Sequence, residues 1–498
     1  MTPPPSFRSG SRITGELNEF MLGVYPPANE AVRHILPGVQ EYDKAHAVAL
    51  IESGAIPSHA GKAIIRELLN LEAQGAVEAR ISVGGQAHSG EQFLRAVLGP
   101  EVSGWLPLGR SSSDIWTVSV RLTQRQRICQ TANVLCHAQQ VFLDLARQHL
   151  DSLMVGYTHL QQAQVTTLGH YFVSVAAEND RNITRLLETL CRVDVSTAGS
   201  AVLTGSPFPL NTARLSELLG FGETFINSRD AAFGLDYLTE DFANVALATN
   251  LFSRLSNDLM LWCTSEFGYL ELADEFCTAS SILPQKKNPV ALQFVRGVAT
   301  QATGELVSAL GTASSLADSI IVDRELVIEN LWHIHDGCDQ SANLLASLLK
   351  TAVVNVERME RTARSSWCFA SELAAVLVLK KGLPWRTAHA AVGTFVRLSL
   401  QRSPDALNAS ISDLQTALSG YEYDVDGLEQ ILKESRDPSA AIHRRIVRGG
   451  PAPSDVRQQI QSLSVSLQSS AEKLRMRAAR WEQARLSLAT LCAELASN

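Results

Sequence analysis

Two serines, two adjacent lysines and an asparagine fall within residues 280–288, inside the stretch "CTASSILPQKKNP" (277–289). Serine hydroxyls and asparagine amides donate hydrogen bonds and lysine adds positive charge, so such a segment is suited to hold a small anion. The alternative is a flexible linker, which the apolar Ile282, Leu283 and Pro284 make less natural. The composition therefore favours binding of a carboxylate or a similar group.

Three further polar clusters interrupt the apolar pattern: "LGRSSSD" (108–114), "GYTHLQQAQ" (156–164) and "GSPFPLN" (205–211). Taken alone, the first is better explained as the start of a helix, because serine and aspartate are favoured helix caps. The second is explained equally well by a polar loop whose histidine bonds a backbone carbonyl. Each cluster by itself is weak evidence for a site.

The segments between the clusters must position them, and their periodicity is helical. From Asp236 to Tyr269 apolar residues recur at steps of three, four and seven, which predicts one long helix. Residues 123–150 and 289–316 show the same pattern, and strand signals are nearly absent. We therefore expect an all-α fold around a bundle of long helices. One bundle would leave apolar surface exposed, so we also expect oligomerisation.

The composition narrows the class of protein. The chain has 498 residues, 45% apolar residues and a net charge of -8, which excludes a basic nucleic-acid-binding protein. The Arg-rich stretch 472–485 alternates with Glu, Ala and Leu and predicts a solvated helix. Eight scattered cysteines without a C-x-x-C pair favour a reducing cytoplasm. No segment predicts a signal peptide or a membrane span.

Turn signals divide the chain into three expected domains: residues 1–109 with an extended N-terminal arm, a central helical bundle over 110–364, and a C-terminal helical domain over 365–498. His333 and His335 are two positions apart, which points them to different faces of a helix. We therefore interpret them as structural, and we expect no metal site.

Taken together, the clusters resemble one family. "SSILPQKKNP" resembles the signature loop of the fumarase/aspartase superfamily, and most closely that of argininosuccinate lyases. "GRSSSD" falls where that family has Gly-Arg-Ser-x-Asn-Asp, and "GYTHLQQAQ" is nearly identical to its Gly-Tyr-Thr-His-Leu-Gln segment. Residues 252–274, 370–393 and "GGPAP" also match, so the resemblance runs along the whole chain.

The resemblance implies a three-domain lyase fold and a homotetramer built on a multi-helix core. Three clusters, the first, second and fourth in chain order, would come from three different subunits to form each active site. The implied reaction is an anti β-elimination that releases fumarate from a small-molecule N- or O-substituted succinate. It implies no cofactor, and no nucleic acid or membrane as a partner.

The resemblance also implies roles for individual residues. Ser280 matches the general base, and Lys286 and Asn288 face the carboxylate that gains charge when the adjacent carbon loses its proton. His159 matches a catalytic histidine. The residues implied to bind substrate, besides Lys286 and Asn288, are Arg110, Ser112, Ser113, Thr158 and Ser281.

Several departures from the family bear on function. The signature begins with Ala279 instead of glycine and has Leu283 instead of methionine, and both changes are conservative in size. The glutamate that pairs with the motif histidine is Gln293, so His159 lacks the partner that would raise its pKa. The family's first motif contains a Ser-Arg-Asn-Asp run, and its Arg-Asn pair is replaced here by Ser112-Ser113, which removes a cation.

The departure that concerns substrate lies at 320–328. Argininosuccinate lyases have tyrosine, arginine, glutamine and lysine where this sequence has Ile320, Val322, Glu325 and Ile328. Apolar side chains hold a guanidino amino acid poorly, so we expect an N-substituted aspartate whose amine is not arginine. The alternatives are an argininosuccinate lyase with altered specificity and a non-catalytic structural tetramer.

Overall fold

The computed structural model describes Phe20 and residues 30–315, 322–423 and 426–497. The rest of the expected N-terminal arm, residues 1–29, lies outside them.

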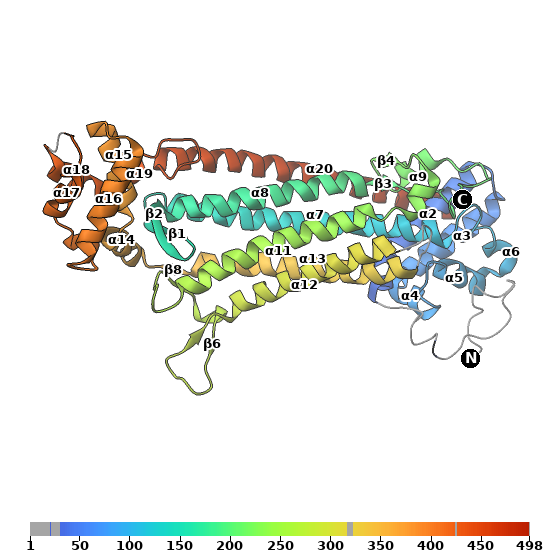
Figure 1. Cartoon of the computed structure of the whole chain (residues 1–498). Coiled ribbons are helices and arrows are strands. Elements are labelled where there is room, and N and C mark those ends of the chain that lie inside the picture. Colours follow the sequence, from blue (N-terminus) through green and yellow to red (C-terminus); the bar gives the residue numbers. More distant parts are fainter. Residues whose placement is uncertain (1–19, 21–29, 316–321, 424–425, 498) are drawn as a thin grey trace.

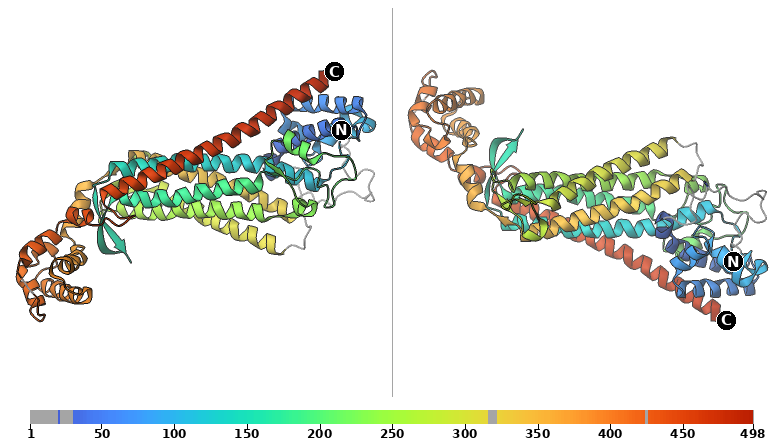
Figure 2. Two further views of the ribbon diagram at one scale, coloured as in Figure 1. Left: turned by 90° about the horizontal axis from the view of Figure 1, so that it is seen from above. Right: turned by 90° about the horizontal axis from the view of Figure 1, so that it is seen from below.

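Long helices running side by side form the body of the molecule (Figures 1 and 2). They confirm the expected all-α fold and a long helix in each of the three segments with helical periodicity, although the helix predicted over 236–269 ends at Trp262. Phe242, Val245 and Phe252 of α11 are fully buried, as the helical spacing of these apolar residues requires. The bundle helices are α7 (Ser112–Gln148), α8 (Leu168–Val193), α11 (Asp236–Trp262), α12 (Val290–Ser315) and α13 (Val322–Thr351).

Short helices cover one end of the bundle. There α2 packs against α7, and the two backbones come so close that a Cβ on Gly38 would lie 2.6 Å from the carbonyl oxygen of Ser119. Glycine at this position therefore permits the close packing. The helices at this end are α2 (Glu30–Glu52), α3 (Ser58–Ala73), α4 (Ala76–Ser82), α5 (Ser89–Leu98), α6 (Pro100–Ser103), α9 (Thr212–Leu218) and α10 (Ser228–Phe233).

A second group of short helices lies at the opposite end and has a hydrophobic core of its own, formed by residues between Phe369 and Leu432 (Figure 1). This core falls within the expected C-terminal domain. The helices of this group are α14 (Val356–Ser365), α15 (Phe369–Lys381), α16 (Trp385–Leu400), α17 (Ile411–Leu418), α18 (Leu428–Ser435) and α19 (Pro438–His443).

The last helix corrects the expected extent of that domain. Helix α20 (Pro453–Ser497) runs back along α7 and α8 to α3, at the other end of the bundle (Figure 2). Its Val456, Leu474 and Trp481 are buried in the main core rather than in the C-terminal core. Residues 453–497 therefore belong to the bundle, because their apolar stripe needs a longer partner than the short helices offer.

None of the helices in the described ranges combines the length and the apolar character that crossing a bilayer requires.

Candidate active site

The signature segment forms a short two-stranded arm that projects from the side of the bundle (Figure 1). Strand β6 (Thr278–Ala279) pairs antiparallel with β7 (Lys287–Asn288), first residue opposite last. Opposite residues of such a pair share a face, and side chains alternate along each strand. Thr278 and Asn288 therefore share one face of the arm, and Ala279 and Lys287 share the other. Ser280 directly follows β6, and Lys286 directly precedes β7.

Two backbone N–H groups of the same loop donate hydrogen bonds to the hydroxyl of Ser280. Its Oγ accepts hydrogen bonds from the backbone N–H of Leu283 at 3.1 Å and of Ile282 at 3.4 Å. Donors held by the backbone stabilise negative charge on the oxygen that they face. This geometry favours the alkoxide form that a serine needs if it is to remove a proton.

Lys287 and Lys286 are adjacent in the arm but differ in their ion-pair partners. Nζ of Lys287 lies 2.7 Å from Asp274 and 3.4 Å from Glu271, and the bond to Asp274 raises the pKa of Lys287. Lys286 is exposed and has no ion-pair partner among the described residues. Lys287 is therefore paired with acidic residues of its own chain, while Lys286 is available to an anion.

The second cluster is a β-hairpin rather than the polar loop that was one interpretation of its sequence. Strands β1 (Leu153–Thr158) and β2 (Gln161–Thr167) are joined by His159 and Leu160, whose φ angles are 52° and 58°. Two-residue hairpin turns need this left-handed backbone, which favours asparagine and glycine. Thr158 and His159 are exposed at the tip, in a strained backbone of the kind often found at functional sites.

The first cluster caps α7. The Oγ of Ser111 accepts from the N–H of Ser113 at 3.4 Å, and the N–H of Ser111 donates to Asp114 Oδ1 at 2.7 Å. This reciprocal arrangement is a capping box. The interpretation of this cluster as a helix start is therefore confirmed.

Two residues of the first cluster are less accessible than their implied role requires. The guanidinium of Arg110 is 1% exposed and lies 2.6 Å from Asp43, and Ser113 is also 1% exposed. Both are enclosed by their own chain, so this geometry argues against direct contact with substrate. Ser112 is half-buried and stays accessible.

The third cluster, which the resemblance left outside the site, packs on the first. A Cβ on Gly109 would lie 2.6 Å from Ser206 Oγ and 2.8 Å from Leu210 Cδ1. Gly109 also has a φ of 78°, so two constraints require glycine there. The density of serine and proline in 205–211 was the only sequence signal for this contact.

These clusters do not meet within one chain. The first spans the start of α7 and the second follows the end of this helix, and a 37-residue helix is about 55 Å long. The signature arm lies at the same end as the hairpin, away from the first cluster (Figure 1). A site that uses all three clusters therefore requires more than one subunit.

The structure describes only part of the 320–328 segment, where this sequence differs from argininosuccinate lyases. Ile320 lies outside the described residues, and the structure describes no side chain for Val322 or Glu325. Ile328 is 1% exposed and packs in the main core, so we correct the expectation that it lines a pocket. Its place on the inner face of α13 accounts for the isoleucine. Gln293 is exposed on α12.

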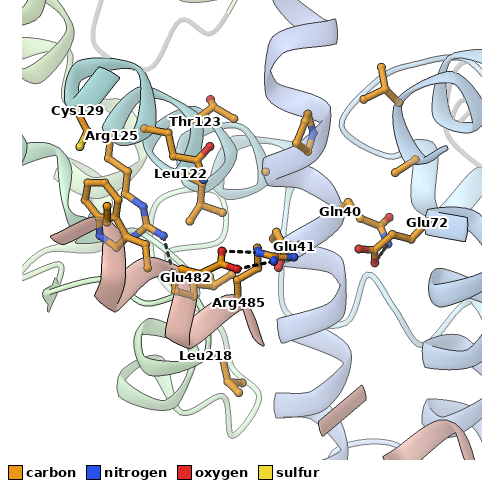
Figure 3. A pocket seen from close by; sticks show the side chains of 18 of the residues that line it. Gln40, Glu41, Glu72, Leu122, Thr123, Arg125, Cys129, Leu218, Glu482 and Arg485 are labelled. Carbon is orange, nitrogen blue, oxygen red and sulfur yellow. Dashed lines mark hydrogen bonds and ion pairs between the residues drawn. The ribbon is translucent and has the colours of Figure 1, made fainter. Parts of the chain in front are cut away.

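A cavity of about 620 Å³ lies between α2, α7, α9 and α20, and none of the four clusters lines it (Figure 3). Its walls include Leu122 and Leu218. Its acidic groups are paired within the chain: Lys44 Nζ lies 3.0 Å from Glu41 and 2.8 Å from Glu72. This cavity is separate from the candidate site.

The histidines and acidic residues of the described ranges do not form a metal site. Across the described ranges, no three histidine, cysteine, aspartate or glutamate side chains come together as a metal site would need. Buried His335 instead bonds Thr131 at 2.8 Å and Asp241 at 3.2 Å, which agrees with the structural interpretation of this histidine.

Known proteins resemble this chain over most of its length. A model of the lyase family matches residues 29–304, and a model of the argininosuccinate lyase C-terminal region matches 367–440. Argininosuccinate lyase of Methanocaldococcus jannaschii is 35% identical, over 84% of this chain and 86% of the relative. The relative from Methanothermobacter thermautotrophicus is 33% identical, over 88% and 94%.

Solved structures agree with the sequence comparisons. A crystal structure of EDDS lyase in complex with formate superimposes with a TM-score of 0.88 at 26% identity, covering 97% of both chains. A variant of EDDS lyase with bound fumarate matches equally well.

Proposed function

Because this chain belongs to the argininosuccinate lyase family of fumarate-releasing carbon–nitrogen lyases, we propose that it removes fumarate from an N-substituted aspartate by anti β-elimination. The observation that carries this proposal is the arm, where Ser280 follows β6 and accepts two backbone N–H groups, while Lys286 directly precedes the paired strand β7 and Asn288 lies in it.

The roles follow from the chemistry. Ser280, as the alkoxide, takes the proton from the carbon next to a carboxylate, and the electron pair moves into that carboxylate to give an aci-carboxylate. Lys286 and Asn288 stabilise its two negative charges. When the electrons return, the carbon–carbon double bond forms, the carbon–nitrogen bond breaks and the nitrogen takes up a proton.

Other accessible side chains hold the substrate. We assign Ser281 on the arm, Ser112 at the start of α7, and Thr158 and His159 at the hairpin tip to contacts with the succinyl group or the amine. Arg110 and Ser113 stay outside this group because they are buried. The contributing clusters come from different subunits of a homotetramer, since they lie at opposite ends of one chain.

The substrate that we propose is ethylenediamine-N,N′-disuccinate (EDDS), which would yield ethylenediamine and two fumarates through the monosuccinyl amine. The match with EDDS lyase over 97% of the chain supports this choice. So do the apolar Ile320 and Val322, which stand where argininosuccinate lyases have tyrosine and arginine.

The test is to incubate the enzyme with fumarate and ethylenediamine and to look for mono- and disuccinyl products by mass spectrometry. The expected result is both products, formed stepwise. No product at high enzyme concentration would exclude this substrate. Argininosuccinate lyase activity is the second candidate, favoured by relatives of that name at 30–35% identity, and fumarate release from argininosuccinate measures it.

A further inference from the structure

The side chain of Tyr42 on α2 contacts the first cluster, residues 108–114, at the start of α7. The Tyr42 hydroxyl donates to Asp114 Oδ2 at 3.1 Å, and both residues are completely buried. Asp114 also accepts the N–H of Ser111 and a backbone hydrogen bond from Ala201, a non-glycine residue with a φ of 52°. Asp114 therefore joins α2, the first cluster and the segment that leads into the third cluster.

The next residue of α2 holds the same loop by charge. Asp43 Oδ1 lies 2.6 Å from Arg110, and Asp43 Oδ2 lies 2.6 Å from Arg80. Burial alone would raise the pKa of Asp43, but Arg110 and Arg80 bring it below its ordinary value. A Cβ on Gly90 would come within 2.2 Å of Asp43 Oδ2, so glycine there leaves room for the carboxylate.

One turn further along α2, His46 holds the start of the loop. Its Nε2 lies 2.9 Å from the carbonyl oxygen of Leu108. Burial and the nearby Arg110 lower the pKa of His46 to about 3, so the ring is neutral and Nε2 carries the donated hydrogen. Three side chains of one helix thus hold positions 108, 110 and 114.

Stability alone is a weak reason for this arrangement. A buried ion pair often contributes less than apolar packing would, because both charges lose their hydration. Buried hydrogen bonds and ion pairs do fix geometry, since each partner has a required position. The loop that these contacts fix presents Ser112, which we assigned to contacts with the succinyl group or the amine.

We propose that Tyr42, Asp43 and His46 are positioning residues that hold the 108–114 loop in its substrate-binding form. This inference rests on the proposed role of that loop.

The test compares two variants of the full-length oligomer. Tyr42→Phe removes the hydroxyl that holds Asp114, while Ser89→Ala removes another buried hydroxyl of the same network, 3.2 Å from Arg80 but without contact to the loop. We expect Tyr42→Phe to weaken fumarate binding by about fivefold to tenfold, in line with one lost hydrogen bond. Ser89→Ala should bind fumarate as the parent does. Calorimetry measures both affinities.

Hydrogen exchange provides a readout that does not depend on fumarate. Amides of residues 111–115 should exchange faster in Tyr42→Phe than in Ser89→Ala. If the two variants match in both affinity and exchange, the positioning role is wrong. If the parent binds no fumarate, the proposed function fails. If exchange in Tyr42→Phe is then still faster, the claim that α2 orders the loop stands without a role in substrate binding. If exchange is equal in the two variants, that claim is wrong as well.

Discussion

At the scale of single residues, the two adjacent lysines of the arm differ by their partners. Lys287 forms ion pairs with Asp274 and Glu271, whereas Lys286, the residue before β7, is exposed and has no ion-pair partner among the described residues. The two lysines therefore divide into one that is paired within the chain and one that is available to an anion.

The first prediction uses that division. Lys286→Met should lower kcat by a factor of about 100 or more, because the aci-carboxylate loses its cation. Lys287→Met should change kcat by less than about tenfold, because it loses only exposed ion pairs that add little. Initial rates of fumarate formation at saturating substrate measure both. Equal losses would contradict the assignment of roles.

A second prediction concerns His46 and pH. Burial lowers its pKa from 6.5 to about 3, so between these values the unfolded chain binds a proton that the folded chain does not, and stability is lost as pH falls. Burial raises the pKa of Asp114 from 3.8 to about 6. Between these values the folded chain holds a proton that the unfolded chain releases, so the contribution of Asp114 to stability is lost as pH rises. Between pH 4 and 6 the two slopes oppose each other, each about 1.4 kcal/mol per pH unit.

His46→Gln removes one of these slopes and keeps an N–H donor for Leu108. The melting temperature of the parent minus that of the variant should therefore increase as pH rises from 4 to 6. Thermal unfolding in a pH series measures it, and a constant difference would show that His46 is not held neutral.

The sequence predicted some of these residues and missed others for a physical reason. Ser280, Lys286 and Asn288 were accessible to sequence reasoning because their spacing within one short loop is local. The burial of Arg110 was not, because Asp43 lies far away in the chain and only the packing of α2 on α7 brings the two together.

At the scale of elements, the long helices followed from periodicity, whereas the strand pairs of the arm and of the hairpin did not. The strands of the arm are too short to show an alternating pattern. The hairpin strands are six and seven residues long but do not alternate between buried and exposed residues, and their turn has His159 and Leu160 where asparagine and glycine are typical. The return of α20 to the bundle was also missed, because periodicity identifies an apolar stripe without identifying its partner.

The third prediction tests strain in that turn. Leu160→Gly should stabilise the protein by about 1 kcal/mol, because a left-handed backbone disfavours a residue with a Cβ. Leu160→Ala removes the same exposed side chain but keeps the Cβ, so it should give no such gain. Melting temperatures compare them. Equal values would show that the turn is unstrained.

At the scale of the whole molecule, the decisive feature is the length of the bundle. Helix α7 alone separates the first cluster from the hairpin by about 55 Å, so one chain cannot bring the two together. Val307 and Leu310 of α12 are 65% and 51% exposed, and the proposed homotetramer would cover this apolar surface.

The last prediction follows from this separation. Ser280→Ala disables the arm, and Ser112→Asp places a negative charge beside the substrate carboxylate at the other end of the bundle. Each variant alone should be inactive. In mixed oligomers purified through two different tags, about a quarter of the sites should combine an intact arm with an intact first cluster, because the two come independently from different subunits. Activity should therefore recover to about a quarter of the parent value per site. If one chain supplied both clusters, no site in the mixture would be intact and the mixed oligomers would stay inactive.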